Sequence, residues 1–249
     1  MFGFFKKARG AGGARVEVHL DNSHLTPGDT LLAEVRIFGG DRDSAFRGVD
    51  VELVTLSPVE DQRGQVQHAQ IHIDGIRLEG GEIAADDEIA AQVEIDLAQT
   101  VPISVGATHT VLRARLDVAG GRDPGHEVAV HIEPTPLQQR VFDAAGAIGF
   151  HLAASEVEHD PARARMIPGA PEVMQEFDFK PKSLTDFGVK EIEISFLPSE
   201  HGVEVLLTVD SRGGIFRLER ERLCRFHVPE MASVDDIARE LRAAIQNFR

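Results

Sequence analysis

Short alternations of apolar and polar residues, interrupted by turn residues, dominate the chain from residue 15 to residue 134. In the first of them, Val16, Val18 and Leu20 stand at every second position, which is the periodicity of a strand with one buried face. No helical period appears in this region, so it is expected to form antiparallel sheet. Seven segments predict strands: 15–20, 30–38, 49–56, 67–78, 89–97, 109–118 and 126–133. A region of this kind is typical of a β-sandwich.

Turn residues separate the predicted strands. In Pro27-Gly28, proline restricts φ and glycine adopts positive φ at little cost, which favours a turn. Further turns are expected at Ser57-Pro58, Gly80-Gly81 and Gly120-Gly121. The segment Pro134-Thr135-Pro136 predicts a linker, because two prolines interrupt the hydrogen bonding of a sheet.

The pattern changes after this linker. Residues 137–150 have a helical period that ends at Gly149, and residues 156–171 predict irregular structure. Strands are then expected at 172–179, 190–197, 203–210 and 215–228. The chain therefore divides into a basic, Phe-bearing tip (1–14), an N-terminal β-sandwich domain (15–134) and a C-terminal mainly-β domain (137–249).

A final amphipathic helix is expected over residues 233–248, with Ser233 as its N-cap. Its apolar stripe consists of Val234, Ile237, Leu241, Ile245 and Phe248. Two interpretations are open: the stripe packs on its own domain, or it binds a partner protein.

Charge is distributed unevenly along the chain. The formal net charge is −15, with 8 Lys and Arg against 22 Asp and Glu between residues 16 and 136. Such a surface disfavours nucleic acid as a partner. The N-terminal tip is basic and aromatic, and its candidate contact residues are Phe2, Phe4, Phe5, Lys6 and Lys7. This tip could contact an anionic membrane weakly, contact an acidic partner, or fold back on the acidic domain.

The chain lacks the sequence features of secreted and membrane-spanning proteins. The basic residues of the tip follow its apolar residues, which is the reverse of a signal peptide, and no stretch of about 18 apolar residues occurs. A single cysteine, Cys224, excludes an internal disulfide. These features predict a cytoplasmic protein.

The sequence contains no common catalytic or nucleotide-binding motif, and we predict no cofactor and no enzymatic activity. The groups considered for a metal are His68, His72 and Asp74, and separately Glu156, Glu158, His159 and Asp160. Solvated surface side chains are the simpler interpretation of both groups. Cys224 is expected to be a buried, inert thiol, because His227 falls on the opposite face of a regular strand.

Several segments together resemble the bacterial sporulation-control protein family, whose members are arrestin-like. They are Phe4-Phe5-Lys6-Lys7, Pro27-Gly28-Asp29, Val101–Gly106, Leu116–Asp123, Gln175–Pro181 and Val203–Asp210. The resemblance implies two arrestin-like antiparallel β-sandwich domains with a short inter-domain helix and a C-terminal helix. It also implies a cytoplasmic protein that regulates a developmental or stress programme by binding other proteins, with no catalytic residues to carry over.

Three function hypotheses follow. The leading one is a non-enzymatic adaptor in which a partner adds a strand to an exposed sheet edge or docks in a groove between the two domains. The alternatives are a peripheral membrane module that uses the N-terminal tip, and a metal-dependent hydrolase. A homodimer formed through an edge strand is compatible with all three.

Overall fold

The chain folds into two compact units, each described here by itself. The computed structural model describes residues 13–22, 24–60, 66–119, 123–159, 161–183, 188–211 and 220–247. Among these, the first unit comprises the residues up to Leu56, Gln70–Ala98 and His109–Ile132. The second comprises Ser57–Ala69, Gln99–Thr108 and the chain from Glu133 onward. The second unit thus includes two short segments, Ser57–Ala69 and Gln99–Thr108, that lie between segments of the first unit in the sequence.

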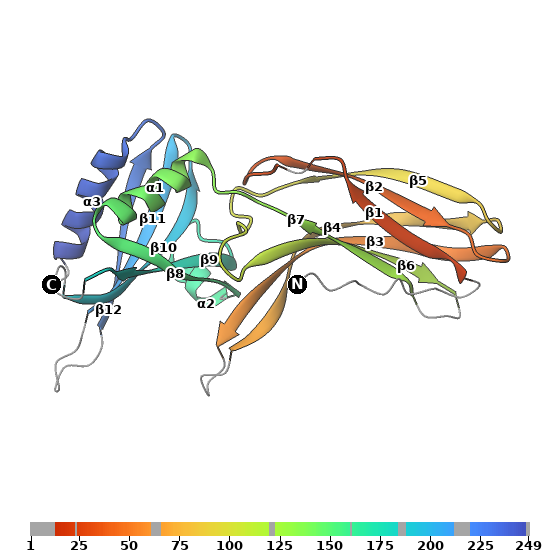
Figure 1. The fold of residues 1–249 in the computed structure, drawn as a ribbon, viewed down its shortest axis with the longest axis horizontal. Coiled ribbons are helices and arrows are strands. Elements are labelled where there is room, and N and C mark those ends of the chain that lie inside the picture. The colour runs from red at the N-terminus through yellow and green to blue at the C-terminus, as the bar shows by residue number, and fades with distance from the viewer. Residues whose placement is uncertain are drawn as a thin grey trace. The chain divides into compact units, whose positions relative to one another are not determined.

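The first unit is built from two antiparallel sheets (Figure 1). Its strands are β1 (Arg15–Leu20), β2 (Thr30–Phe38), β3 (Ser44–Glu60), β4 (Val66–Ile83), β5 (Glu88–Asp96), β6 (His109–Val118) and β7 (Gly125–Val130). One sheet has the order β1-β2-β5 and the other β4-β3-β6-β7. Strands β3 and β4 extend beyond this unit into the second.

The alternation seen in the sequence produces the core of this unit. Every second residue of β2, from Leu31 to Ile37, is buried, and β3 buries Val49, Val51 and Leu53 in the same way. Because successive side chains of a strand point to opposite faces, each sheet has one apolar face. These residues form a β-sandwich core.

The second unit is built on one five-stranded antiparallel sheet with the order β12-β11-β10-β9-β8. Its elements are α1 (Pro136–Ala147), β8 (Phe150–His159), α2 (Pro161–Met166), β9 (Val173–Pro181), β10 (Val189–Ser199), β11 (Gly202–Ser211), β12 (Arg220–Pro229) and α3 (Val234–Asn247). Helices α1 and α3 pack side by side against the sheet (Figure 1).

Both long helices lie on the same face of this sheet. Phe142 of α1 has its ring 5.0 Å from that of Phe177 and 5.6 Å from that of Phe196, measured between centroids. Strand register puts Cys224 on the same face, and its thiol is within electrostatic range of Glu240 of α3. We call this the helix face and the opposite one the outer face. A helical layer therefore covers the sheet where a sandwich would have a second sheet.

Both helices are capped by side chains at their N-termini. In α1 the Thr135 hydroxyl accepts from the amide of Gln138, whose side chain accepts in turn from the amide of Thr135. This is a capping box, so the predicted linker also starts a helix. Ser233 caps α3 by accepting from the amide of Asp236, as expected. Gly149 follows α1 with φ of +99°, which confirms the predicted stop.

Two of the predicted turns are wrong, because the structure places them inside strands. Ser57-Pro58 lies within β3, and Gly80-Gly81 lies within β4. A Cβ on Gly80 would stand 2.5 Å from the carbonyl oxygen of Phe46, so glycine is required by the close approach of the β3 backbone. The glycine pair marks a contact between strands and not a reversal of the chain.

The irregular structure expected over residues 156–171 is replaced in part by regular elements. Strand β8 extends to His159, and α2 follows it. The apolar periodicity of β8 is weak, since Leu152 is only half-buried and a register shift interrupts its pairing with β9 between Leu152 and Ala154. A shift of this kind removes the strict alternation on which strand prediction depends.

Candidate functional site

In the second unit, hydrogen bonds from side chains cover the edge of the sheet that is formed by β8. Gln175 of β9 is buried, and its amide forms two opposed hydrogen bonds with the main chain of Ile103: the Ile103 amide donates to Oε1 at 2.7 Å, and Nε2 donates to the Ile103 carbonyl at 2.9 Å. Nε2 also donates to the hydroxyl of Ser155 at 2.9 Å. The Gln175 side chain thus supplies hydrogen bonds of the kind that a neighbouring strand would supply, and these hold the 99–108 segment against β8 and β9.

Two hydroxyl groups complete this closure of the β8 edge. The amide of Val157 donates to the Ser57 hydroxyl at 2.8 Å, and the Thr108 hydroxyl donates to the carbonyl of Ser155 at 3.1 Å. Ser57, Thr108 and Ser155 are buried. An edge strand otherwise presents unpaired main-chain groups to other chains, so these contacts protect β8.

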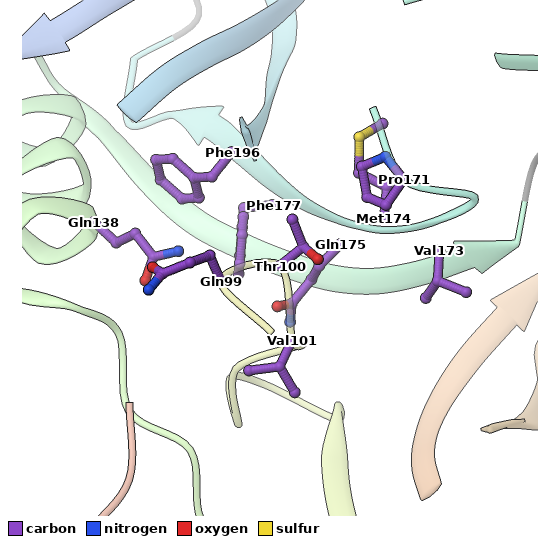
Figure 2. Close-up of a pocket in the computed structure, with 10 residues that line it drawn as sticks. All are labelled: Gln99, Thr100, Val101, Gln138, Pro171, Val173, Met174, Gln175, Phe177 and Phe196. Atoms are coloured by element: carbon purple, nitrogen blue, oxygen red, sulfur yellow. The ribbon is translucent and has the colours of Figure 1, made fainter. Parts of the chain in front are cut away.

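A cavity of about 20 Å³ lies beside this closure, and Figure 2 shows Gln175 among its lining residues, next to Thr100 and Val101. The rings of Phe177 and Phe196 also line it. A volume of this size matches a single water molecule. It excludes this cavity as the site of an organic ligand.

A larger hollow lies at the start of α1. This groove is open and has a volume of about 510 Å³. Its walls combine apolar and polar side chains: Gln99, Thr135, Pro136, Leu137, Gln138, Arg140, Phe196, Pro198, Ser199, Gly202, Val203 and Glu230. The Nε of Arg140 is buried without a hydrogen-bond partner among the described residues, while its Nη2 donates to the carbonyl of Glu230. We call this hollow the α1 groove.

Carboxylates crowd the outer face of the same sheet. Asp178 of β9 stands directly opposite Glu193 of β10 in the strand register. Burial, together with Glu191 and Glu158, raises the pKa of the Asp178 carboxyl above its ordinary value, and Lys180 opposes this shift. Like charges facing each other across two strands reduce stability.

Changing Asp178 to Asn is expected to raise the free energy of unfolding at pH 7 by a few tenths to about 1 kcal/mol, after screening by water is considered. The pKa of Asp178 is higher in the native state than in the unfolded state. At pH values between the two, the native protein therefore keeps a proton that the unfolded chain has lost. The wild type therefore loses stability as pH rises through the native pKa, and the advantage of Asn disappears in acid.

Urea unfolding followed by circular dichroism at several pH values tests this expectation. Glu200→Gln, in the exposed turn between β10 and β11, is the matched control and should change little. A loss of stability at pH 7 with Asp178→Asn would contradict the proposed effect of burial.

The apolar stripe of the last helix lies inside the second unit. Ile237, Leu241 and Ile245 are buried, and Val234 is half-buried. Phe248 is outside the described residues, as are Phe2, Phe4, Phe5, Lys6 and Lys7 of the N-terminal tip. A partner could reach the buried part of the stripe only if α3 left its place beside α1.

The residues considered for metal binding are not brought together. Within the described part of the chain, no three His, Cys, Asp or Glu side chains are placed to hold an ion. His159 falls on the opposite face of β8 from Glu156 and Glu158 by strand alternation. His72 and Asp74 are exposed on β4, while the side chain of His68, like Asp160, is outside the described residues.

The single cysteine is half-buried and not fully buried as the sequence suggested. Burial raises the pKa of the Cys224 thiol, and the charge of Glu240 adds to the shift. A thiol with a raised pKa is protonated at neutral pH and is a poor nucleophile. None of the described helices is long and apolar enough to span a bilayer.

Comparison with known proteins identifies the family. The model of the family described as SpoOM protein matches residues 5–213. The chain belongs to the SpoOM family. Within the family, it is 30% identical over 215 residues to the sporulation-control protein spo0M of Bacillus subtilis (strain 168), covering 84% of this chain and 81% of that protein.

The fold agrees with that of a solved SpoOM family member. The crystal structure of Spo0M from Bacillus subtilis matches with a TM-score of 0.79 and 24% sequence identity, covering 95% of this chain and 99% of that one. The resemblance found in the sequence and the mainly-β, arrestin-like fold that it implied are thus confirmed.

Sequence reasoning missed the closure of the β8 edge and the α1 groove. Gln175 carries no chemical motif, and its partner lies 72 positions away at Ile103. The SpoOM resemblance contained a usable signal, because Val101–Gly106 and Gln175–Pro181 are two of the segments that carry it. The structure joins those two segments.

Proposed function

We propose that this SpoOM family protein is a non-enzymatic regulatory adaptor of the cytoplasm that binds another protein in the α1 groove. The observation that carries the proposal is the groove itself: it is open, holds about 510 Å³, and has both apolar and hydrogen-bonding walls. Extended peptide segments bind to surfaces of this kind. The name of the Bacillus subtilis relative, a sporulation-control protein, supports a regulatory role.

The groove offers a distinct contact to each part of a bound segment. Leu137, Phe196 and Pro198 supply apolar surface, while Ser199 and Gln99 supply polar groups. Each hydrogen-bonding group can pair with a peptide main chain, and the apolar surface selects side chains. The regulated process is proposed to be a developmental or stress programme, in keeping with the relative.

A paired substitution on the first turn of α1 tests the groove. Leu137→Glu puts a carboxylate into the groove and keeps the helix, since acidic residues are favoured in a first turn. Gln139→Glu, two residues further along, lies on the exposed side and is the matched control. Tagged full-length wild type and both variants are used to capture partners from native cytoplasm at physiological salt, with mass spectrometry as the readout.

We expect one protein to be captured by wild type and Gln139→Glu and at least tenfold less by Leu137→Glu. Equal capture by all three proteins would contradict binding in the groove. The absence of any reproducible partner would contradict the adaptor function, as would turnover of a small molecule that Leu137→Glu abolishes. Thermal melts of both variants establish that each remains folded.

A further inference from the structure

The three-stranded sheet of the first unit has one open edge, which is formed by β5. In this sheet β5 is the outermost strand and pairs with β2 alone, in a regular antiparallel register (Figure 1). The amide of Leu97 donates to the carbonyl of Asp29, and the amide of Gly39 donates to the carbonyl of Asp87, so the odd-numbered residues of this strand bond to β2. Because main-chain groups alternate in direction along a strand, the even-numbered residues direct theirs away from β2.

Most of these outward main-chain groups are unpaired. Glu88 donates its amide to the carboxylate of Asp87 at 2.9 Å. In the part of the chain that the structure describes, the amides and carbonyls of the four other even-numbered residues have no hydrogen-bond partner: Ala90, Gln92, Glu94 and Asp96. The opposite edge of the sheet differs, since the amide of Val18 in β1 donates to Nδ1 of His126 at 3.1 Å. A regular edge with unpaired groups is a template for a further strand.

The apolar core is also less well covered along this side of the sandwich. The facing sheet has four strands and ends in β4. Strand β1 packs against β6 and β7, so β2 and β5 follow over β6 and β3, and no described strand of the smaller sheet remains to cover β4. The aliphatic side chains of β4 are accordingly only half-buried, while those of β3 are fully buried. They are Ile71, Ile73, Ile76 and Leu78.

Ile89 of β5 lies at the same opening. Its side chain is on the core face of the sheet, opposite Ile37 of β2 in the strand register. Ile37 is 5% exposed, but Ile89 is 37% exposed. Val93 and Ile95, further along the same face of β5, are buried. A fourth strand beside β5 would therefore cover apolar side chains of both sheets.

The other face of β5 is acidic. Glu88, Glu94 and Asp96 are exposed there. Arg36 lies 3.4 Å from Glu88, whereas Glu94 has no ion pair among the described residues. Antiparallel pairing of β5 with a second copy about Gln92 would put Glu88 opposite Asp96, and like charges facing each other across strands are destabilising. A strand with basic side chains on this face is complementary.

We propose that β5 binds an extended segment of a partner protein as a fourth strand of its sheet. The segment alternates apolar and basic residues. Its apolar side chains cover Ile89 and the half-buried row of β4, and its Lys or Arg side chains lie beside Glu88 and Glu94. Its main chain pairs with the outward groups of β5, which is recognition by strand addition. This surface belongs to the first unit, so it is separate from the α1 groove.

Two synthetic peptides test the surface on the full-length protein. The probe has the length of β5, nine residues, and alternates Lys with Val. The control peptide has the same composition, with every Lys placed before the first Val. Because charge and composition are equal, a difference in affinity depends on the alternation. By fluorescence anisotropy, we expect the alternating peptide to bind about tenfold more tightly or better.

A proline substitution tests the free edge itself. Gln92→Pro removes the central outward amide and keeps the pairing with β2, because this amide points away from β2. Gln92→Thr is the matched control, since threonine keeps the amide and is favoured in strands. We expect Gln92→Pro to bind the alternating peptide about tenfold more weakly or worse, and Gln92→Thr to bind it like wild type. Thermal melts establish that both variants are folded.

A charge reversal provides a second variant that leaves the strand unchanged. Glu94 is exposed and makes no ion pair among the described residues, so Glu94→Lys should fold like wild type. It should weaken binding of the alternating peptide, because lysines then face each other. Leu137→Glu in the α1 groove should bind this peptide like wild type, which separates failure of the edge from failure of the groove.

Amide hydrogen exchange followed by NMR identifies strand addition directly. Saturation with the alternating peptide should slow exchange at the amides of Gln92 and Glu94 about tenfold or more and leave the α1–α3 layer unchanged. The proposal is overturned by lack of binding, by equal affinity for the two peptides, by undiminished binding to folded Gln92→Pro or to Glu94→Lys, or by unchanged exchange in β5.

Discussion

Replacing Phe177 with alanine is expected to lower the free energy of unfolding of the second unit by about 3–5 kcal/mol. Phe177 is 2% exposed and lies on the helix face of the sheet. Its ring centroid is 5.0 Å from that of Phe142 and 5.7 Å from that of Phe196. Truncation to alanine leaves a cavity between α1 and the sheet, and the rings of Phe142 and Phe196 lose their contact with the ring of Phe177.

Hydrogen exchange read by mass spectrometry measures this effect in the second unit alone. The method suits a chain without Trp or Tyr, and it avoids the assumption that both units unfold together. Met231→Ala is the control, since Met231 is 93% exposed. A loss of less than about 1 kcal/mol for Phe177→Ala would show that α1 does not depend on this packing.

Replacing Gln175 with leucine is expected to destabilise the second unit by about 2–5 kcal/mol. Leucine fills a similar volume but removes both hydrogen bonds to Ile103 and the one to Ser155. The amide of Ile103 then remains buried without its partner, which costs about 1–3 kcal/mol, while its carbonyl keeps only the hydrogen bond from the Val105 amide. The two other lost hydrogen bonds add about 0.5–1.5 kcal/mol each. The cost is therefore larger than that of a surface hydrogen bond.

The location of the effect distinguishes this loss from general destabilisation. The amide of Ile103 should exchange with solvent much faster in Gln175→Leu, while protection in the α1–α3 layer persists. Gln139→Leu is the control, because its side chain makes one exposed hydrogen bond, to Asp143. Unchanged exchange at Ile103 would contradict the role of Gln175 in holding the 99–108 segment.

Most elements of the fold could be predicted from local patterns. Alternation located β1, β2, β5 and β6 within one or two residues, because each has one face in a core. The N-cap Ser233 located the start of α3, since a helix leaves its first amides without partners. Prediction failed at β8 and Gly80, where register shifts or close strand contacts determine the structure.

The candidate sites could not be predicted in the same way. Segment 99–108 lies between β5 and β6 of the first unit but belongs to the second. Its attachment depends on Gln175, whose role appears only when β9 is paired with β8. The α1 groove likewise joins residues from Gln99 to Glu230, and no local pattern relates positions so far apart.

The sequence by itself determined the β-rich class and the family, since these follow from residue identity and short-range order. Only the tertiary structure decided which edge of the sheet is closed, which helix faces are covered, and that β12 is an outer strand. Strand order and edge protection arise from hydrogen bonds between distant segments. Their energy depends on proximity in space, which periodicity along the chain does not encode.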